Sequence, residues 1–253
     1  MSFYSLSKSQ RVEKVKQIKA DILTGIRKNN PKPIIEFFSD EDTYIRKTAY
    51  LSIGKIYFVD KAIQKKTIAA LNKLIKEEHH YIRQTVINAV GEIGKKDFEI
   101  VEDFFDRALF DEHHAVRNAV IGSVKKMGER NPKPVLKWAK KYLHHTDKEI
   151  RREICHGIEL RGRTHPQDIL PLLKELQHDK TARVRNTLVH VLGQISYKKG
   201  CLETVIAHLN TWQNKDLVTD AVEEIIDVHD RYKDFAILSQ KQALQYIKKH
   251  FNE

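Results

Sequence analysis

The segment 149–166, EIRREICHGIELRGRTHP, concentrates side chains that could do chemistry. Besides a repeated arginine, it carries Arg152, His156, Glu159, Arg161 and Arg163. Guanidinium groups bind phosphate oxygens through paired, charge-assisted hydrogen bonds. The surrounding stretch 124–163 has 12 basic and 5 acidic residues, within a chain whose net charge is +11. This localised charge favours a polyanionic partner and binding that weakens steeply with salt.

An internal repeat must position these side chains. An Ile-Arg or Val-Arg pair recurs with spacings of 37, 34, 34 and 34 residues, at Arg46, Arg83, Arg117, Arg151 and Arg185. Counted from the apolar residue before each arginine, apolar residues return at +4, +8 and +11, which is a helical period. Each such helix follows another apolar-periodic segment, often with proline near its start. Thr219, a further 34 residues on, lies in a sixth unit that lacks the arginine, as expected of a terminal repeat.

These patterns predict an all-α fold, an α-solenoid of about six helix pairs, because one pair cannot bury its apolar face alone. The repeats are predicted at roughly 31–60, 61–96, 97–130, 131–164, 165–200 and 201–232, with helical caps at both ends. No Gly-, Ser- or Pro-rich linker divides the chain, so we expect a single domain over residues 1–253.

An aspartate precedes the repeated arginine by six residues in three units, at Asp40, Asp111 and Asp179. This pattern resembles the HEAT repeat over about residues 31–230. The segments NPKPVLKWAKKYL, EIRREICHG and LPLLKELQHDKTARVRNTLVHVLGQI are further similar to the bacterial HEAT-like alkylpurine DNA glycosylases of the AlkC/AlkD superfamily. The resemblance implies that the second helices line a concave surface and that double-stranded DNA is a partner.

The polar face of the second helices supplies the predicted DNA contacts. Positions one, five and eight after each arginine share this face. Together with the two arginines that end the fourth unit, the predicted DNA-binding residues are Asn118, Lys125, Arg152, His156, Arg161, Arg163, Asn186 and His190. Contact with the DNA backbone rather than with base edges is expected. Alternatively, Arg161 has no ligand and its long side chain only reaches solvent at a helix end. The repeated arginines are interpreted as structural partners of the aspartates.

Glu159 is the candidate catalytic residue, because excision of a base needs an acid to stabilise the positive charge that grows on the sugar. Trp138 and Trp212 are the candidate aromatic contacts to a cationic base. A core position is the alternative for both tryptophans, and an i, i+4 pair with Arg163 is the alternative for Glu159. The acid expected beside Gly157 from the glycosylase resemblance is replaced by His156. An alkylpurine DNA glycosylase and a DNA-binding relative without activity therefore both remain open.

The sequence predicts no metal site and no cofactor, because the histidine doublets lie in turns and lack the i, i+4 spacing of a zinc site. No apolar run approaches the ~20 residues that span a bilayer. Cys155 and Cys201 form no recognisable disulfide framework, so we expect a cytoplasmic monomer. The alternative function is a non-catalytic protein–protein interaction scaffold that recognises an acidic partner.

Overall fold

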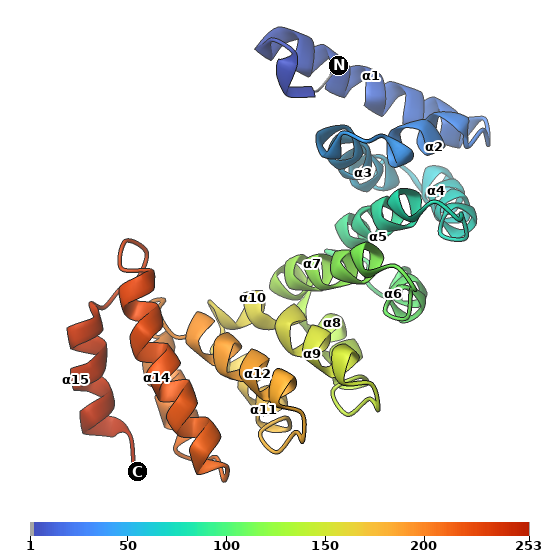
Figure 1. Ribbon diagram of the computed structural model, residues 1–253. Helices are drawn as coiled ribbons and strands as arrows, with labels where there is room; N and C mark the ends of the chain where they lie inside the picture. Colours follow the sequence, from blue (N-terminus) through green and yellow to red (C-terminus); the bar gives the residue numbers. More distant parts are fainter. Residues whose placement is uncertain (1–2, 253) are drawn as a thin grey trace. The chain divides into compact units, whose positions relative to one another are not determined.

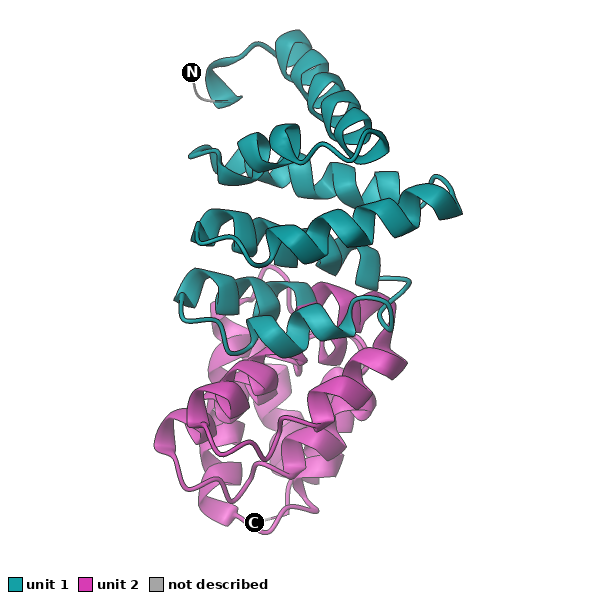
Figure 2. Ribbon diagram, turned by 90° about the vertical axis from the view of Figure 1, so that its right-hand side faces the viewer, with its two compact units in different colours: residues 1–123 teal, residues 124–253 magenta. Residues whose placement is uncertain are grey.

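A computed structural model describes residues 3–252 as helices joined by turns (Figure 1). Every regular element in these residues is helical, which confirms the all-α prediction. The chain divides into two compact units, residues 1–123 and 124–253 (Figure 2), and each is described by itself. The single-domain expectation stays a prediction. Among the described residues, no helix combines the length and apolar character needed to cross a membrane.

Unit 1 consists of a short 3-10 turn and stacked helix pairs. A capping box at Ser7 and Gln10 opens its first long helix. The elements are η1 (Phe3–Ser5), α1 (Lys8–Arg27), α2 (Lys32–Ser39), α3 (Thr43–Tyr57), α4 (Lys61–Leu74), α5 (His80–Gly94), α6 (Glu102–Ala108) and the first part of α7 (His114–Arg130). The second helices α3 and α5 pack side by side. Their apolar stripes are buried with Phe37 and Phe38 of α2.

Unit 2 continues the pattern with the rest of α7. Its other helices are α8 (Pro132–Lys140), α9 (Lys148–Gly157), α10 (Glu159–Gly162), α11 (Pro166–Lys174), α12 (Ala182–Gln194), α13 (Cys201–Leu209), α14 (Lys215–Arg231) and α15 (Gln240–His250). Prolines occupy the first turns of α8 and α11, where a missing N–H leaves no bond unmade. The second helices α9, α12 and α14 pack in one layer, and the first helices α11 and α13 pack in the other. This arrangement is the predicted α-solenoid.

Two of the repeated arginines, Arg83 and Arg151, join consecutive repeats through aspartates. Arg83 donates to both carboxylate oxygens of Asp111 at 2.8 and 3.0 Å, and Arg151 does the same to Asp179 at 2.6 and 3.1 Å. In each pair the aspartate lies in the turn that precedes the next second helix. The backbone carbonyl of Asp179 accepts in turn from Arg185. Each such turn therefore holds the arginines of two successive repeats.

Glycines inside the second helices mark close helix packing. A Cβ added to Gly54 would lie 2.6 Å from Cβ of Glu92, and one added to Gly193 would lie 2.6 Å from Cγ of Glu224. Both neighbours belong to the next second helix. The approach of that helix therefore explains the glycines without a ligand.

The second helix of the fourth repeat is interrupted, whereas the periodicity predicts a continuous helix. The helix is interrupted at Ile158, and the short α10 follows with Glu159 as its first residue. Gly162 of α10 packs so closely that an added Cβ would lie 2.3 Å from Cδ1 of Ile169 and 2.7 Å from Cγ2 of Ile195. Glu159, the residue after the interruption, lies in the interior and is 1% exposed.

Candidate nucleic-acid interface

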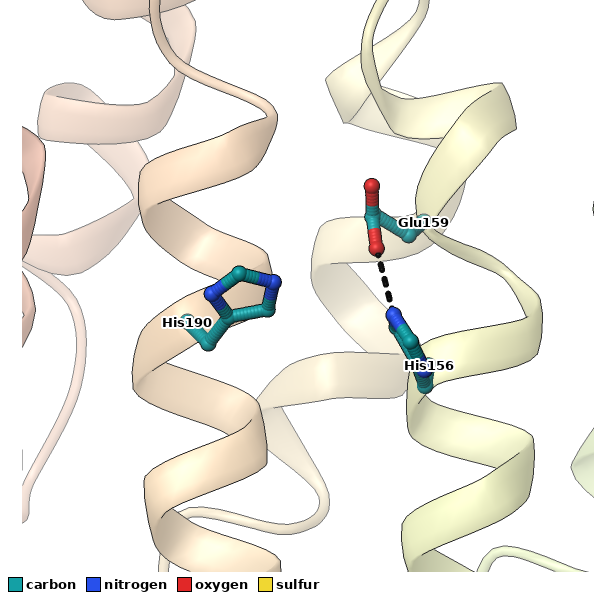
Figure 3. A group of neighbouring side chains, drawn as sticks. All are labelled: His156, Glu159 and His190. Carbon is teal, nitrogen blue, oxygen red and sulfur yellow. Dashed lines mark ion pairs between the residues drawn. The ribbon is translucent and has the colours of Figure 1, made fainter. Parts of the chain in front are cut away.

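Three helices and the end of α7 bring the predicted site residues of unit 2 together. Lys125 of α7 places its Nζ 2.8 Å from Nε2 of His156 and 3.0 Å from Oε2 of Glu159. Nε2 of His156 and Oε2 of Glu159 lie 3.1 Å apart. His190 of α12 directs one ring nitrogen toward this pair (Figure 3). Lys125 thus contacts both His156 and Glu159, which also contact each other.

Glu159 is ionised and fully engaged in this cluster. Its other carboxylate oxygen accepts from Arg163, which also donates to Oε1 of Gln194 at 2.8 Å. Burial alone would raise the pKa of Glu159, but the contacts with His156 and Lys125 and the nearby charge of Arg163 lower that pKa to about 2. The i, i+4 pair between Glu159 and Arg163 is thus present.

The arginines of the fourth repeat are largely neutralised by carboxylates. Arg161, with its side chain 15% exposed, contacts Asp168 of α11 at 2.6 and 2.7 Å. Arg163 is held by Glu159, and Arg152 lies 2.9 Å from Glu149. The three guanidinium groups therefore do not form the free cationic surface that their charges suggest. Arg161 in particular joins α10 to α11, because a charge at this half-buried helix end needs a partner.

A shallow groove of about 390 Å³ runs between α9 and α12. The lining contains no acidic residue. All six side chains that line the groove can form hydrogen bonds, and they are Arg152, His156, Arg183, Asn186, Thr187 and His190. Glu149 lies beside it and bridges the two arginines, at 2.9 Å from Arg152 and 3.1 Å from Arg183. Four of the predicted contacts, Arg152, His156, Asn186 and His190, therefore share one groove.

Arg183 is a groove residue that the sequence reasoning missed. It lies three and four residues before Asn186 and Thr187, so all three share one helix face. Extending the polar stripe one turn toward the start of α12 would have identified it. Its side chain is 66% exposed, more than that of any arginine predicted in this unit.

His190 connects the groove to α14. Its Nδ1 lies 3.7 Å from Oε1 of Glu224, and its ring lies edge-to-face with the ring of His156, with centroids 6.0 Å apart. Burial lowers the pKa of His190, and this effect outweighs the nearby carboxylates of Glu159 and Glu224. The imidazole is therefore neutral at pH 7, since its ordinary pKa is 6.5.

The remaining predicted residues lie elsewhere. Asn118 is an exposed residue of α7 in unit 1. Trp138 and Trp212 are 1% and 2% exposed, and Nε1 of Trp212 donates to Nδ1 of His208 at 2.8 Å. Both tryptophans occupy the core positions given by the alternative, so neither ring is available to a base in this structure.

Comparison with known proteins relates the chain to helical repeat proteins. A family model described as Cnd1, non-SMC mitotic condensation complex subunit 1, matches residues 23–109. No curated protein matches. Among solved structures, AlkD2 from Streptococcus mutans is 16% identical, covers 78% of this chain and 97% of its own, and gives a TM-score of 0.57. A chain of the Pds5–Scc1 complex is 12% identical, with 92% of this chain and 41% of that chain covered and a TM-score of 0.53.

At these identities the structural neighbours define the fold alone. They agree with the helix-pair architecture described above. The predicted resemblance to HEAT-repeat proteins, AlkD2 among them, is thereby confirmed at the level of the fold. By its fold, the chain is a HEAT-like α-solenoid.

Proposed function

We propose that the chain binds the sugar-phosphate backbone of duplex DNA through the groove between α9 and α12. The observation that carries this proposal is the lining, in which Arg152, Arg183 and Asn186 carry N–H donors and no residue is acidic. These side-chain types make most protein contacts to phosphate oxygens. The proposal moves the contact surface away from Arg161 and Arg163, which carboxylates hold.

Glu149 organises the groove without closing it to an anion. Glu149 contacts both guanidinium groups, and Arg152 also lies 3.6 Å from Glu153, so Arg183 is the groove arginine whose charge is least neutralised. Arg183 uses one Nη atom in the recorded contact and keeps other N–H groups for a phosphate oxygen. A phosphate seated between the arginines would complete their pairing.

We propose that this binding takes place without base excision by Glu159. A carboxylate that already faces Lys125 and Arg163 has its charge compensated, which weakens any stabilisation of a second cation on a sugar. The tryptophans are buried as well. The proposed link to DNA alkylation repair rests on the resemblance of the fourth and fifth repeats to the AlkC/AlkD superfamily, and it takes the form of DNA recognition.

The test is fluorescence anisotropy with a labelled duplex at several salt concentrations. Arg152→Ala with Arg183→Ala should weaken binding and reduce the salt slope by about one for each lost phosphate contact. Arg27→Ala with Lys28→Ala, which removes two exposed positive charges of unit 1, is the charge-matched control. A double variant with the slope and affinity of the control would refute the proposal.

A protein–protein interaction scaffold is the second candidate, favoured by an apolar groove in unit 2 that Phe235 and Ile237 line while 66% and 60% exposed. In the same lining the buried Tyr197 stacks on Tyr232, with centroids 5.3 Å apart. Lys198, Lys199 and Glu129 also line this groove, and the two lysines would favour an acidic partner segment. If DNA affinity at physiological salt falls to the non-specific range, roughly 10⁻⁴ to 10⁻⁶ M, the scaffold becomes the better account.

A further inference from the structure

We infer that His156, Glu159 and His190 form a binding site for a divalent transition-metal ion of the zinc class. One ligand atom from each residue lies within 4.8 Å of the others. Two ligands on a tetrahedral zinc ion, at bond lengths near 2.05 Å, are about 3.3 Å apart. Nε2 of His156 and Oε2 of Glu159 already lie 3.1 Å apart. The side chain of His190 is 44% exposed, so a change of rotamer can bring its ring nitrogen to the same distance.

The cluster already holds a cation in the position that a metal would take. The ammonium of Lys125 contacts both Nε2 of His156 and Oε2 of Glu159. With the imidazole proton on Nδ1, both atoms present lone pairs to this positive charge. A metal ion would displace this ammonium group, and Lys125 therefore acts as an internal competitor.

The surroundings fix the ligands in the way that metal sites require. Arg163 holds Oε1 of Glu159 and leaves Oε2 to bind the ion through one atom. Glu224 stands behind His190, with Oε1 3.7 Å from Nδ1. A carboxylate that hydrogen-bonds the second nitrogen of a histidine ligand orients the ring and increases its basicity, and Glu224 lies within a small side-chain movement of that distance. The contact of Arg163 with Oε1 of Glu159 distinguishes this cluster from histidines and acids that merely lie close together.

The donor set selects the class of ion. Two imidazoles and one carboxylate suit zinc and its neighbours in the first transition series, whereas magnesium and calcium prefer oxygen ligands alone. Three protein ligands leave one tetrahedral position open. Because His156 and His190 also line the α9–α12 groove, that position faces the groove.

The sequence contains a signal for this site that the search for histidine doublets did not use. His156 and Glu159 have i, i+3 spacing, and His190 follows His156 by one repeat of 34 residues. Repeat-equivalent positions on neighbouring second helices lie side by side. The inference goes beyond the proposed function, since metal binding does not depend on whether the groove binds DNA.

The test is zinc binding by the full, tag-free chain, measured by competition with a chromophoric chelator. Wild-type protein should bind one equivalent. His190→Ala should lower the affinity by at least about tenfold, whereas Lys125→Met should raise it by removing the competing ammonium. His178→Ala, which removes an exposed histidine of the same unit, is the matched control and should leave the affinity unchanged. Cobalt loading adds a visible spectrum that reports tetrahedral coordination.

The outcomes separate clearly. A tenfold loss in His190→Ala together with tighter binding in Lys125→Met supports the site, because a purely structural ion-pair network predicts neither result. Zinc binding that His190→Ala leaves unchanged overturns it. Absence of binding in the wild type overturns it for the native chain, even if Lys125→Met binds the ion. Circular dichroism of each variant checks that the helices are retained.

Discussion

Glu159→Gln should destabilise the protein and remove part of its pH dependence. The folded-state pKa of Glu159 is lowered from its usual 4.5 to about 2, which corresponds to about 3 kcal/mol of stabilisation of the ionised native state. That stabilisation is fully present above the unfolded-state pKa and is lost as pH falls from 4.5 toward 2. Because Lys125 and Arg163 are 24% and 31% exposed and regain some hydration, we expect a loss of about 2 to 3 kcal/mol at pH 7.

The assay is urea unfolding followed by circular dichroism between pH 7 and pH 3.5. Over this range the wild type should lose about 1 to 1.5 kcal/mol more stability than Glu159→Gln, since the unfolded chain binds a proton at this position and the native chain does not. Glu203→Gln, at an exposed carboxylate of α13, is the control and should match the wild type. Equal stability and equal pH slopes for Glu159→Gln and wild type would refute the account of a buried, paired carboxylate.

Two further predictions concern the packing between repeats. Asp179→Ala leaves the guanidinium of Arg151, which is 15% exposed, without its carboxylate. The variant should lower the free energy of unfolding by about 2 to 4 kcal/mol. A double-mutant cycle with Arg151→Ala that shows no coupling energy in urea unfolding would contradict this. Gly162→Ala places a Cβ 2.3 Å from Ile169 and should cost about 1 to 3 kcal/mol. By contrast, Gly122→Ala, with no described atom within 4 Å of the new Cβ, should be neutral or stabilising by up to about 1 kcal/mol. Thermal unfolding of the two glycine variants checks both signs.

The repeats could be predicted from the sequence because their determinants are local. Each second helix is defined by apolar residues at helical spacing, and each repeat packs only against its neighbours. The arginine of one repeat meets an aspartate 28 residues later, at Arg83 and Asp111 and again at Arg151 and Asp179. The chain repeats this pairing at a fixed interval, so a periodic search reveals it.

The site was less predictable because it arises where the period is broken. The tight packing of Gly162 depends on Ile169 and Ile195, which lie later in the chain. Glu159, the residue after the interruption at Ile158, is buried and contacts Lys125, 34 residues earlier. The count of charged residues likewise overestimated the number of free positive side chains, because Arg161 pairs with Asp168, which lies beyond the next turn. Residues on one continuous helix face, such as Asn186 and His190, were placed correctly beside each other.

The burial of both cysteines makes thiol chemistry a direct measure of motion in unit 2. Cys155 and Cys201 are 0% and 1% exposed, and burial raises the pKa of each thiol. Alkylating reagents can therefore reach either sulfur only when α9 or α13 separates from its neighbours. Labelling rates at the two positions, followed by mass spectrometry, would rank how readily each helix opens and whether an added metal or duplex slows that opening.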